Sequence, residues 1–97
     1  MTDTTSLCLN VKTGGAIVID GRIWVMVMSR EPRVVALKMT QVAYADVVLN
    51  LRPGFKCGVP GRDDVIIEFL PSSQTSQTRL RVSAPRSVSI KLEIADE

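Results

Sequence analysis

Basic side chains are the only chemically suggestive group that this sequence gathers in one segment. Arg79, Arg81, Arg86 and Lys91 fall close together near the end of the chain. Arg79 and Arg81 would share one face of a strand, because side chains alternate along a strand. Guanidinium and ammonium groups in such a row bind nucleic-acid phosphates or form a plain solvated sheet face, and both interpretations stay open. The formal net charge is +2, so any site for a polyanion must be local.

Catalytic and metal chemistry has little support in this composition. The chain has no histidine, which removes a His-based acyl-transfer triad, a His-containing zinc site and an imidazole base. Asp63 and Asp64 would point to opposite faces of a strand start, which favours a solvated turn over a carboxylate pair. Gly14-Gly15 precedes a predicted strand rather than a helix and indicates a tight turn, not a phosphate loop. We therefore expect no enzyme, no catalytic residue, no cofactor and no metal.

Length, cysteine usage and the N-terminal residues set further expectations. At 97 residues and 45% hydrophobic, the chain is predicted to be a single domain over residues 1–97. Cys8 and Cys57 lack CxxC spacing and are expected to be free, mostly buried thiols, with one disulfide bridge as the alternative. No long apolar run or signal-peptide pattern is present, so a cytoplasmic location is predicted. Residues 1–6 are expected to form a disordered tail.

The elements that must position the polar residues are predicted to be strands throughout. Ile17, Ile19, Ile23, Val25 and Val27 are all β-branched, and the Asp20-Gly21 pair between them is typical of a hairpin turn. No window of twelve residues shows a helical apolar stripe free of Pro or Gly. The fold class is therefore predicted to be all-β. The aromatic residues Trp24, Phe69 and Tyr44 are expected to lie in the core or half-buried in a sheet.

The sequence also contains a repeat. The run Leu9-Asn10-Val11-Lys12-Thr13-Gly14 returns as Leu49-Asn50-Leu51-Arg52-Pro53-Gly54, and Gly21-Arg22 returns as Gly61-Arg62. We interpret residues 7–46 and 47–94 as two repeats that share one core, with chance similarity of two β-rich stretches as the alternative. The second repeat is longer, and its surplus at 71–77 is polar and predicts a mobile hairpin loop.

Five strands are predicted in each repeat. They are 7–12 and 47–52, 16–19 and 56–59, 22–28 and 64–70, 34–38 and 79–83, and 42–46 and 88–93.

The beginning and the end of the chain resemble one family of regulators. The run from Leu9 to Ile19 with its following Asp-Gly turn, and the run Arg79-Leu80-Arg81-Val82-Ser83-Ala84-Pro85-Arg86-Ser87-Val88-Ser89-Ile90, are similar to the start and end of carbon storage regulator (CsrA/RsmA) proteins. The resemblance covers residues 7–94. It implies intertwined five-stranded protomers that bind GGA-containing loops of messenger RNA leaders and block translation.

A tandem copy of that family would be its homodimer written as one chain. The resemblance therefore implies two intertwined five-stranded units in a compact β-sandwich or barrel-like pseudo-dimer, which would be monomeric in solution.

The resemblance also implies which residues contact RNA. First-strand contacts fall on Leu9, Asn10, Val11 and Lys12, and in the second copy on Leu49, Asn50, Leu51 and Arg52. The fifth-strand Arg of the family falls on Leu92, directly after Lys91, and on Asp46 in the first copy. The predicted RNA-binding residues are Leu9, Asn10, Lys12, Arg86 and Lys91, with a second, weaker site at Asn50 and Arg52.

Chain continuity predicts that the two sites differ. Residues 42–46 run directly into 47–52, whereas parallel neighbouring strands need a crossover of about a dozen residues or more. The segment 42–51 is therefore expected to form one long or bent strand, and the surviving site is expected where 7–12 meets 88–93.

Two functions follow from this sequence. The first is a translational regulator that binds a messenger RNA leader or a small RNA and does not contact membranes. The alternative is a protein-interaction or antagonist module that has kept the fold and lost RNA binding, because Leu92 and Asp46 stand where the family has Arg.

Overall fold

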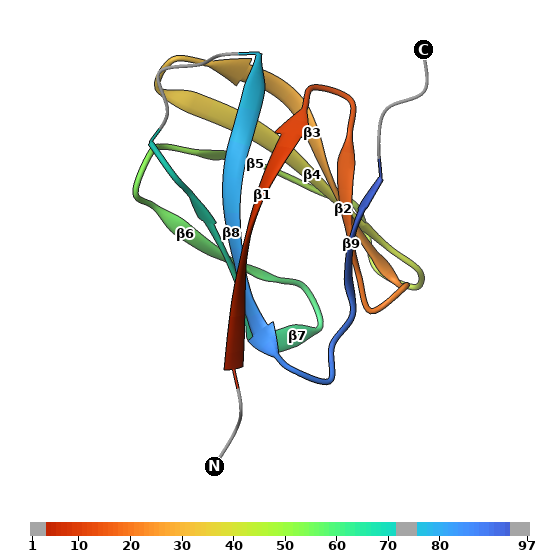
Figure 1. The fold of residues 1–97 in the computed structure, drawn as a ribbon. Coiled ribbons are helices and arrows are strands. Elements are labelled where there is room, and N and C mark those ends of the chain that lie inside the picture. The colour runs from red at the N-terminus through yellow and green to blue at the C-terminus, as the bar shows by residue number, and fades with distance from the viewer. Residues whose placement is uncertain (1–3, 72–75, 94–97) are drawn as a thin grey trace.

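Nine strands make up the computed structural model, which describes residues 4–71 and 76–93 (Figure 1). The strands are β1 (Thr4–Lys12), β2 (Ala16–Ile19), β3 (Ile23–Glu31), β4 (Val34–Gln41), β5 (Val47–Leu51), β6 (Lys56–Val59), β7 (Arg62–Phe69), β8 (Gln77–Pro85) and β9 (Ile90–Glu93). The predicted all-β class is confirmed. In the described part of the chain no helix is long and apolar enough to cross a membrane. Residues 72–75 of the predicted hairpin loop lie outside the described residues.

The strands form two antiparallel sheets that exchange their edge strands. One sheet has the order β1-β8-β7-β6, and the other has the order β5-β4-β3-β2-β9. The first strand of the chain thus joins strands from the second half, along a register that runs from Thr4 opposite Pro85 to Lys12 opposite Gln77. The β9 strand, from the end of the chain, is the edge strand next to β2 in the sheet that also contains β3 and β4. Neither half of the chain forms its sheet alone.

One core lies between the two sheets. Burial alternates along the strands: Leu80 and Val82 of β8 are fully buried, whereas Arg79 and Arg81 between and beside them are exposed. The same period of two marks β3, and the buried side chains of both sheets form one contiguous cluster around Phe69. Full burial of such a side chain contributes about 1.5–3 kcal/mol. The β-branched alternation in the sequence is therefore what joins the sheets.

The sequence repeat has a counterpart in the backbone. Three backbone hydrogen bonds recur in the turns after β1 and β5. After β1 they are Gly14 N to Val27 O (2.8 Å), Val27 N to Gly15 O (3.0 Å) and Gly15 N to Lys12 O (2.8 Å). After β5 they are Gly54 N to Phe69 O (2.7 Å), Phe69 N to Phe55 O (3.1 Å) and Phe55 N to Arg52 O (3.0 Å). Gly14 and Gly54 both have a positive φ, 92° and 86°. Glycine adopts this conformation without a steric penalty, which explains why both copies keep it.

The predicted strand at 42–46 is wrong, and so is the continuous strand predicted over 42–51. These residues form the turn that reverses the chain between the antiparallel neighbours β4 and β5. Tyr44 N–H donates to the Gln41 carbonyl at 3.2 Å, and Ala43 has a φ of 72°. An extended strand cannot include such a residue, because left-handed backbone bends the chain.

Three smaller predictions also need correction. Residues 4–6 belong to β1, so the tail predicted over 1–6 is too long; residues 1–3 lie outside the described chain. Tyr44 is exposed, whereas Phe69 is buried and Trp24 half-buried as predicted. The cysteines were predicted to be mostly buried, but Cys8 is exposed. Its side chain lies on the outer face of the sheet, opposite to the face of Leu7 and Leu9, and both cysteines are free.

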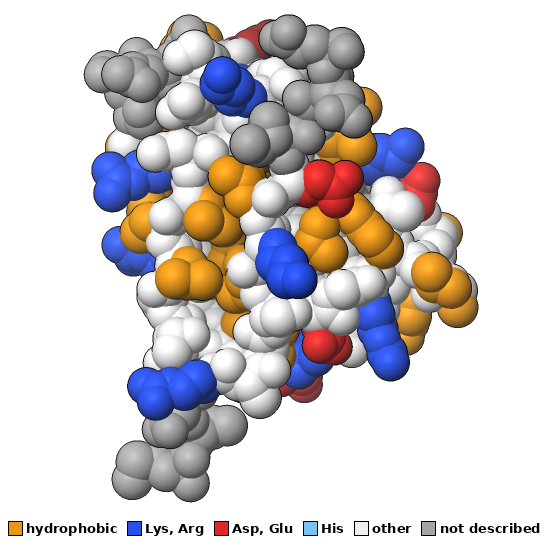
Figure 2. Space-filling model, turned by 45° about the vertical axis from the view of Figure 1, so that its right-hand side comes forward, with side chains coloured by type: hydrophobic (Ala, Val, Ile, Leu, Met, Phe, Trp, Pro, Cys, Tyr) orange, Lys and Arg blue, Asp and Glu red, His pale blue; other side chains and the backbone are white. Residues whose placement is uncertain are grey.

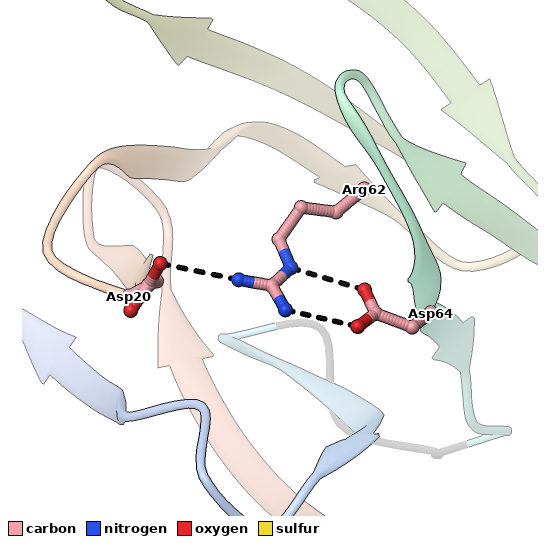
Figure 3. A network of polar contacts seen from close by, with 3 residues as sticks. All are labelled: Asp20, Arg62 and Asp64. Carbon is pink, nitrogen blue, oxygen red and sulfur yellow. Dashed lines mark hydrogen bonds and ion pairs between the residues drawn. The ribbon is translucent and has the colours of Figure 1, made fainter.

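An arginine clamp joins the two sheets at one end of the molecule (Figure 3). Arg62, the first residue of β7, donates to both carboxylate oxygens of Asp64 at 3.0 and 2.9 Å and to Asp20 at 3.1 Å. Asp20 lies in the turn between β2 and β3, in the other sheet. The hydrogen bonds from Arg62 hold the pKa of the Asp64 carboxyl below its ordinary value of 3.8. The carboxylate form of Asp64 is therefore favoured in the folded protein.

We expect Asp64→Asn to lower the melting temperature slightly at neutral pH. Because the folded pKa of Asp64 is depressed, its stabilisation is present above the ordinary carboxyl pKa and is lost as pH falls through the folded value. The difference from wild type should therefore shrink in thermal melts recorded at decreasing pH. Asp63→Asn is the control, since no ion pair of Asp63 is found within the described chain. A difference for Asp64→Asn that does not change with pH would contradict this role.

Candidate functional site

The free edges of β1 and β9 form a seam between the two sheets. Within the described chain, β1 pairs with β8 alone and β9 with β2 alone, and both strands run toward the same end of the molecule (Figure 1). Their ends converge on Gly15: a Cβ there would lie 3.1 Å from the Lys12 carbonyl oxygen and 3.3 Å from that of Glu93. The ends of segments 7–12 and 88–93, which the sequence predicted to lie beside each other, thus approach at Gly15, and no β-ladder joins β1 to β9 within the described chain.

Apolar side chains line this seam. Leu7 and Leu92 are 45% and 43% exposed, and Leu9 and Ile90 are half-buried beside them. Leu9 pairs with buried Leu80, and Leu92 pairs with buried Ile17, so both point toward the core side of their sheets. Figure 2 shows hydrophobic side chains in the middle of this side of the molecule, with Lys, Arg, Asp and Glu side chains between and around them. The core is therefore partly open to solvent along the seam.

The predicted polar residues flank the seam on two sides. Asn10 and Lys12 are exposed on the outer face of the β1 sheet, and Lys91 is exposed on the outer face of the β9 sheet, opposite half-buried Val18. Arg86 follows Pro85, which pairs with Thr4, so it lies at the far end of β1 from Lys12. At about 3.3 Å per residue, β1 spans roughly 26 Å. The five predicted residues therefore follow the length of the seam and do not form one cluster.

Charged neighbours modify this site. Arg79 is exposed opposite Asn10 and adds a cation beside Lys12, although it was assigned from the sequence only to a general basic segment. Arg81 is paired instead with Glu68 at 3.3 Å. Glu93 lies two residues after Lys91 on the same face and lowers the positive potential there. The stronger cationic side of the seam is therefore the side with Asn10, Lys12 and Arg79.

The second predicted site has a different construction. Asn50 and Arg52, at the end of β5, line a cleft of about 780 Å³ together with Arg33, Val34, Pro53 and Phe55. Among the described residues β5 pairs with β4 alone, as expected from chain continuity at 42–52, and Asp46 forms an ion pair with Lys38 at 3.5 Å. Sequence reasoning missed Arg33 and Phe55. The sequence signal for Phe55 was that, in the 40-residue repeat, a large aromatic residue stands in the second copy where the first copy has Gly15.

The Cys57 thiol is half-buried. Burial raises the pKa of the Cys57 thiol to about 11, so this cysteine stays protonated at neutral pH. Among the described residues no group of three or more His, Cys, Asp or Glu side chains could hold a metal ion.

A comparison with protein-family models finds no matching family, and comparisons with curated proteins and with solved structures find no significant similarity.

Convergence of β1 and β9 on Gly15 can be tested by adding one methyl group. Gly15→Ala should cost about 1–3 kcal/mol of stability, as overpacking does, because the two carbonyl oxygens must move apart. Urea unfolding at equilibrium measures this difference. Gly58→Ala is the matched control, since a Cβ there meets nothing within 4 Å and the change should be neutral or slightly stabilising. Equal effects of the two substitutions would contradict the close approach of β9 to β1.

Proposed function

We propose that this protein is a translational regulator of the carbon storage regulator type, which binds an unpaired GGA-containing loop of a messenger RNA leader or small RNA. It acts by binding and without catalysis, with the β1–β9 seam as its RNA site. The single observation that carries the proposal is the approach of the ends of β1 and β9 at Gly15, with Leu7 and Leu92 exposed on the two strands and with Asn10, Lys12 and Lys91 exposed on the outer faces of their sheets.

The strand exchange supports this proposal. In the resemblance drawn from the sequence, two five-stranded units share their edge strands, and the seam joins the first strand of one unit to the last strand of the other. The pairing of β1 with β8, and of β5 with β4, follows that scheme. So does the repeated set of hydrogen bonds at the turns after β1 and β5. We infer that the chain is a fused pseudo-dimer of such units.

The chemistry of the seam suits a single-stranded RNA loop. Unpaired bases offer apolar faces as well as hydrogen-bonding edges, and proteins bind them by combining apolar contact with cations for the phosphates. Leu7, Leu9 and Leu92 supply the apolar surface, and Lys12 and Lys91 supply cations on either side. Asn10 can both donate and accept a hydrogen bond at a base edge. This combination is the reason for preferring RNA over a plain solvated face.

The alternative function is a protein-interaction or antagonist module. It is favoured by one observation: Leu92, with 43% of its surface exposed, stands on β9 where a regulator of this type has an Arg. Leucine offers no hydrogen bond to a guanine edge, whereas Arg offers a planar fork. The two functions are separated by the RNA titration that follows.

We predict that Lys12→Ala and Lys91→Ala each weaken binding to a GGA hairpin by about fivefold, as expected for the loss of one charge-assisted contact. Each should also reduce the slope of log K against log salt by about 0.7, because one phosphate contact is lost on a single strand. Fluorescence anisotropy with a labelled hairpin measures both quantities.

The control variant for this titration is Arg52→Ala, which removes a cation from the other end of the repeat. It should change hairpin affinity by less than twofold or so, and a hairpin with a scrambled loop should bind weakly to every variant. Two hairpins bound per chain, or an Arg52→Ala defect equal to that of Lys91→Ala, would contradict the one-site proposal. No GGA-dependent binding at physiological salt would favour the protein-interaction alternative.

We also predict that the chain is a monomer, because the edge-strand exchange that would join two protomers takes place within one chain. Light scattering at low concentration should give the mass of one chain, 10.6 kDa. A dimer that persists on dilution would contradict the fused pseudo-dimer.

A further inference from the structure

The cleft at the end of β5 combines an exposed aromatic ring with two guanidinium groups. Phe55 is 64% exposed, and Arg33 and Arg52, which line the same cleft, are exposed as well. Arg33 comes from the turn between β3 and β4, and Arg52 and Phe55 come from the turn after β5. None of the lining residues that the structure describes is acidic. The cleft therefore carries positive charge beside an apolar ring.

The equivalent position in the other sheet explains why the ring is exposed. Gly15 occupies the same place in the repeated turn as Phe55, and β9 packs against it so closely that a Cβ would lie 3.3 Å from the Glu93 carbonyl. The sheet that contains β6 has no fifth strand beside that edge among the described residues. A strand added there in the manner of β9 would meet the Phe55 side chain. The cleft is therefore not a vacant place for another strand.

We propose that this cleft holds one base of a single-stranded RNA, stacked on the Phe55 ring, with the neighbouring phosphates bound by Arg33 and Arg52. A base presents a flat π-face that stacks on an aromatic ring whatever its sequence, and guanidinium groups pair with phosphate oxygens. Asn50 lies in the same cleft and can hydrogen-bond the edge of the stacked base.

The proposal rests on the proposed function, because the cleft would extend the path of the RNA bound at the seam. From Leu9 the path crosses to Leu80 of β8, then to Phe69 of β7, then to Phe55, whose carbonyl accepts from Phe69 N–H at 3.1 Å. Three strand spacings of about 4.8 Å give about 14 Å sideways, and Lys12 lies about 10 Å farther along β1 than Leu9. Lys12 and Phe55 are therefore about 17 Å apart, or about five nucleotides at a stacked spacing of about 3.4 Å. Arg79, exposed on β8, lies between the two sites. The cleft would thus bind nucleotides flanking the loop, not a second GGA loop.

The test compares a GGA hairpin with the same hairpin carrying unpaired flanks of about eight adenosines at both ends. Flanks should tighten binding to the wild-type protein by about tenfold, the contribution of one stacked base. Phe55→Leu keeps the apolar bulk but loses the ring, and should remove most of this gain; Phe55→Tyr should keep it. Arg33→Ala should also reduce the gain. Binding of the hairpin without flanks should change by less than about twofold in all three variants.

A second measurement separates stacking from general charge attraction. In NMR spectra, the Phe55 ring protons should shift upfield when the flanked RNA is added, because a stacked base shields them. The proposal is overturned if flanks give no gain, or if Phe55→Leu and Phe55→Tyr behave alike.

Failure of the seam and failure of the cleft give different results. If the hairpin does not bind at the seam, an isolated oligomer of eight adenosines still reports on the cleft, and a Phe55-dependent affinity for it would support the cleft alone. If the hairpin binds but the flanks add nothing, the cleft proposal falls and the proposed function stands. No binding of either RNA overturns both.

Discussion

The exchange of edge strands between the two halves of the chain is the constraint on which the rest of the structure depends. The β1 strand pairs with β8, and β9 pairs with β2, so the first and last strands of the chain are edge strands of different sheets. The buried side chains of both sheets meet in a single cluster, and neither half could cover its apolar face without the other. The close approach of β1 to β9 at Gly15 is a direct consequence of this exchange.

The same exchange makes the two ends of the repeat unequal. The chain must pass from β4 to β5 without interruption, and it uses residues 42–46 as the reversing turn. Those residues are then not free to form a strand equivalent to β9. Among the described residues one sheet has five strands and the other four, although both turns after β1 and β5 keep the same hydrogen bonds. Covalent continuity therefore breaks a symmetry that the sequence repeat would otherwise allow.

This asymmetry separates two kinds of surface on one scaffold. Gly15 allows β9 to pack closely, next to the leucines and lysines of the seam, whereas Phe55 at the repeat position stands exposed in a cleft that Arg33 and Arg52 also line. A single residue difference at equivalent positions thus accompanies a packed strand in one place and an open aromatic cleft in the other. In the proposed function, the seam would select the loop and the cleft would add affinity without selecting sequence.

The sequence by itself determined the all-β class, the alternation of buried and exposed residues and the positions of the glycine turns, because these depend on local side-chain type and on spacing along one strand. It also indicated that residues 7–12 and 88–93 meet. Only the tertiary structure decided that 42–46 is a turn, that Cys8 and Tyr44 face solvent, and that Arg33 joins Arg52 and Phe55 in one cleft. These outcomes depend on which strands become neighbours across the sheets, and a local pattern in the chain carries no record of that pairing.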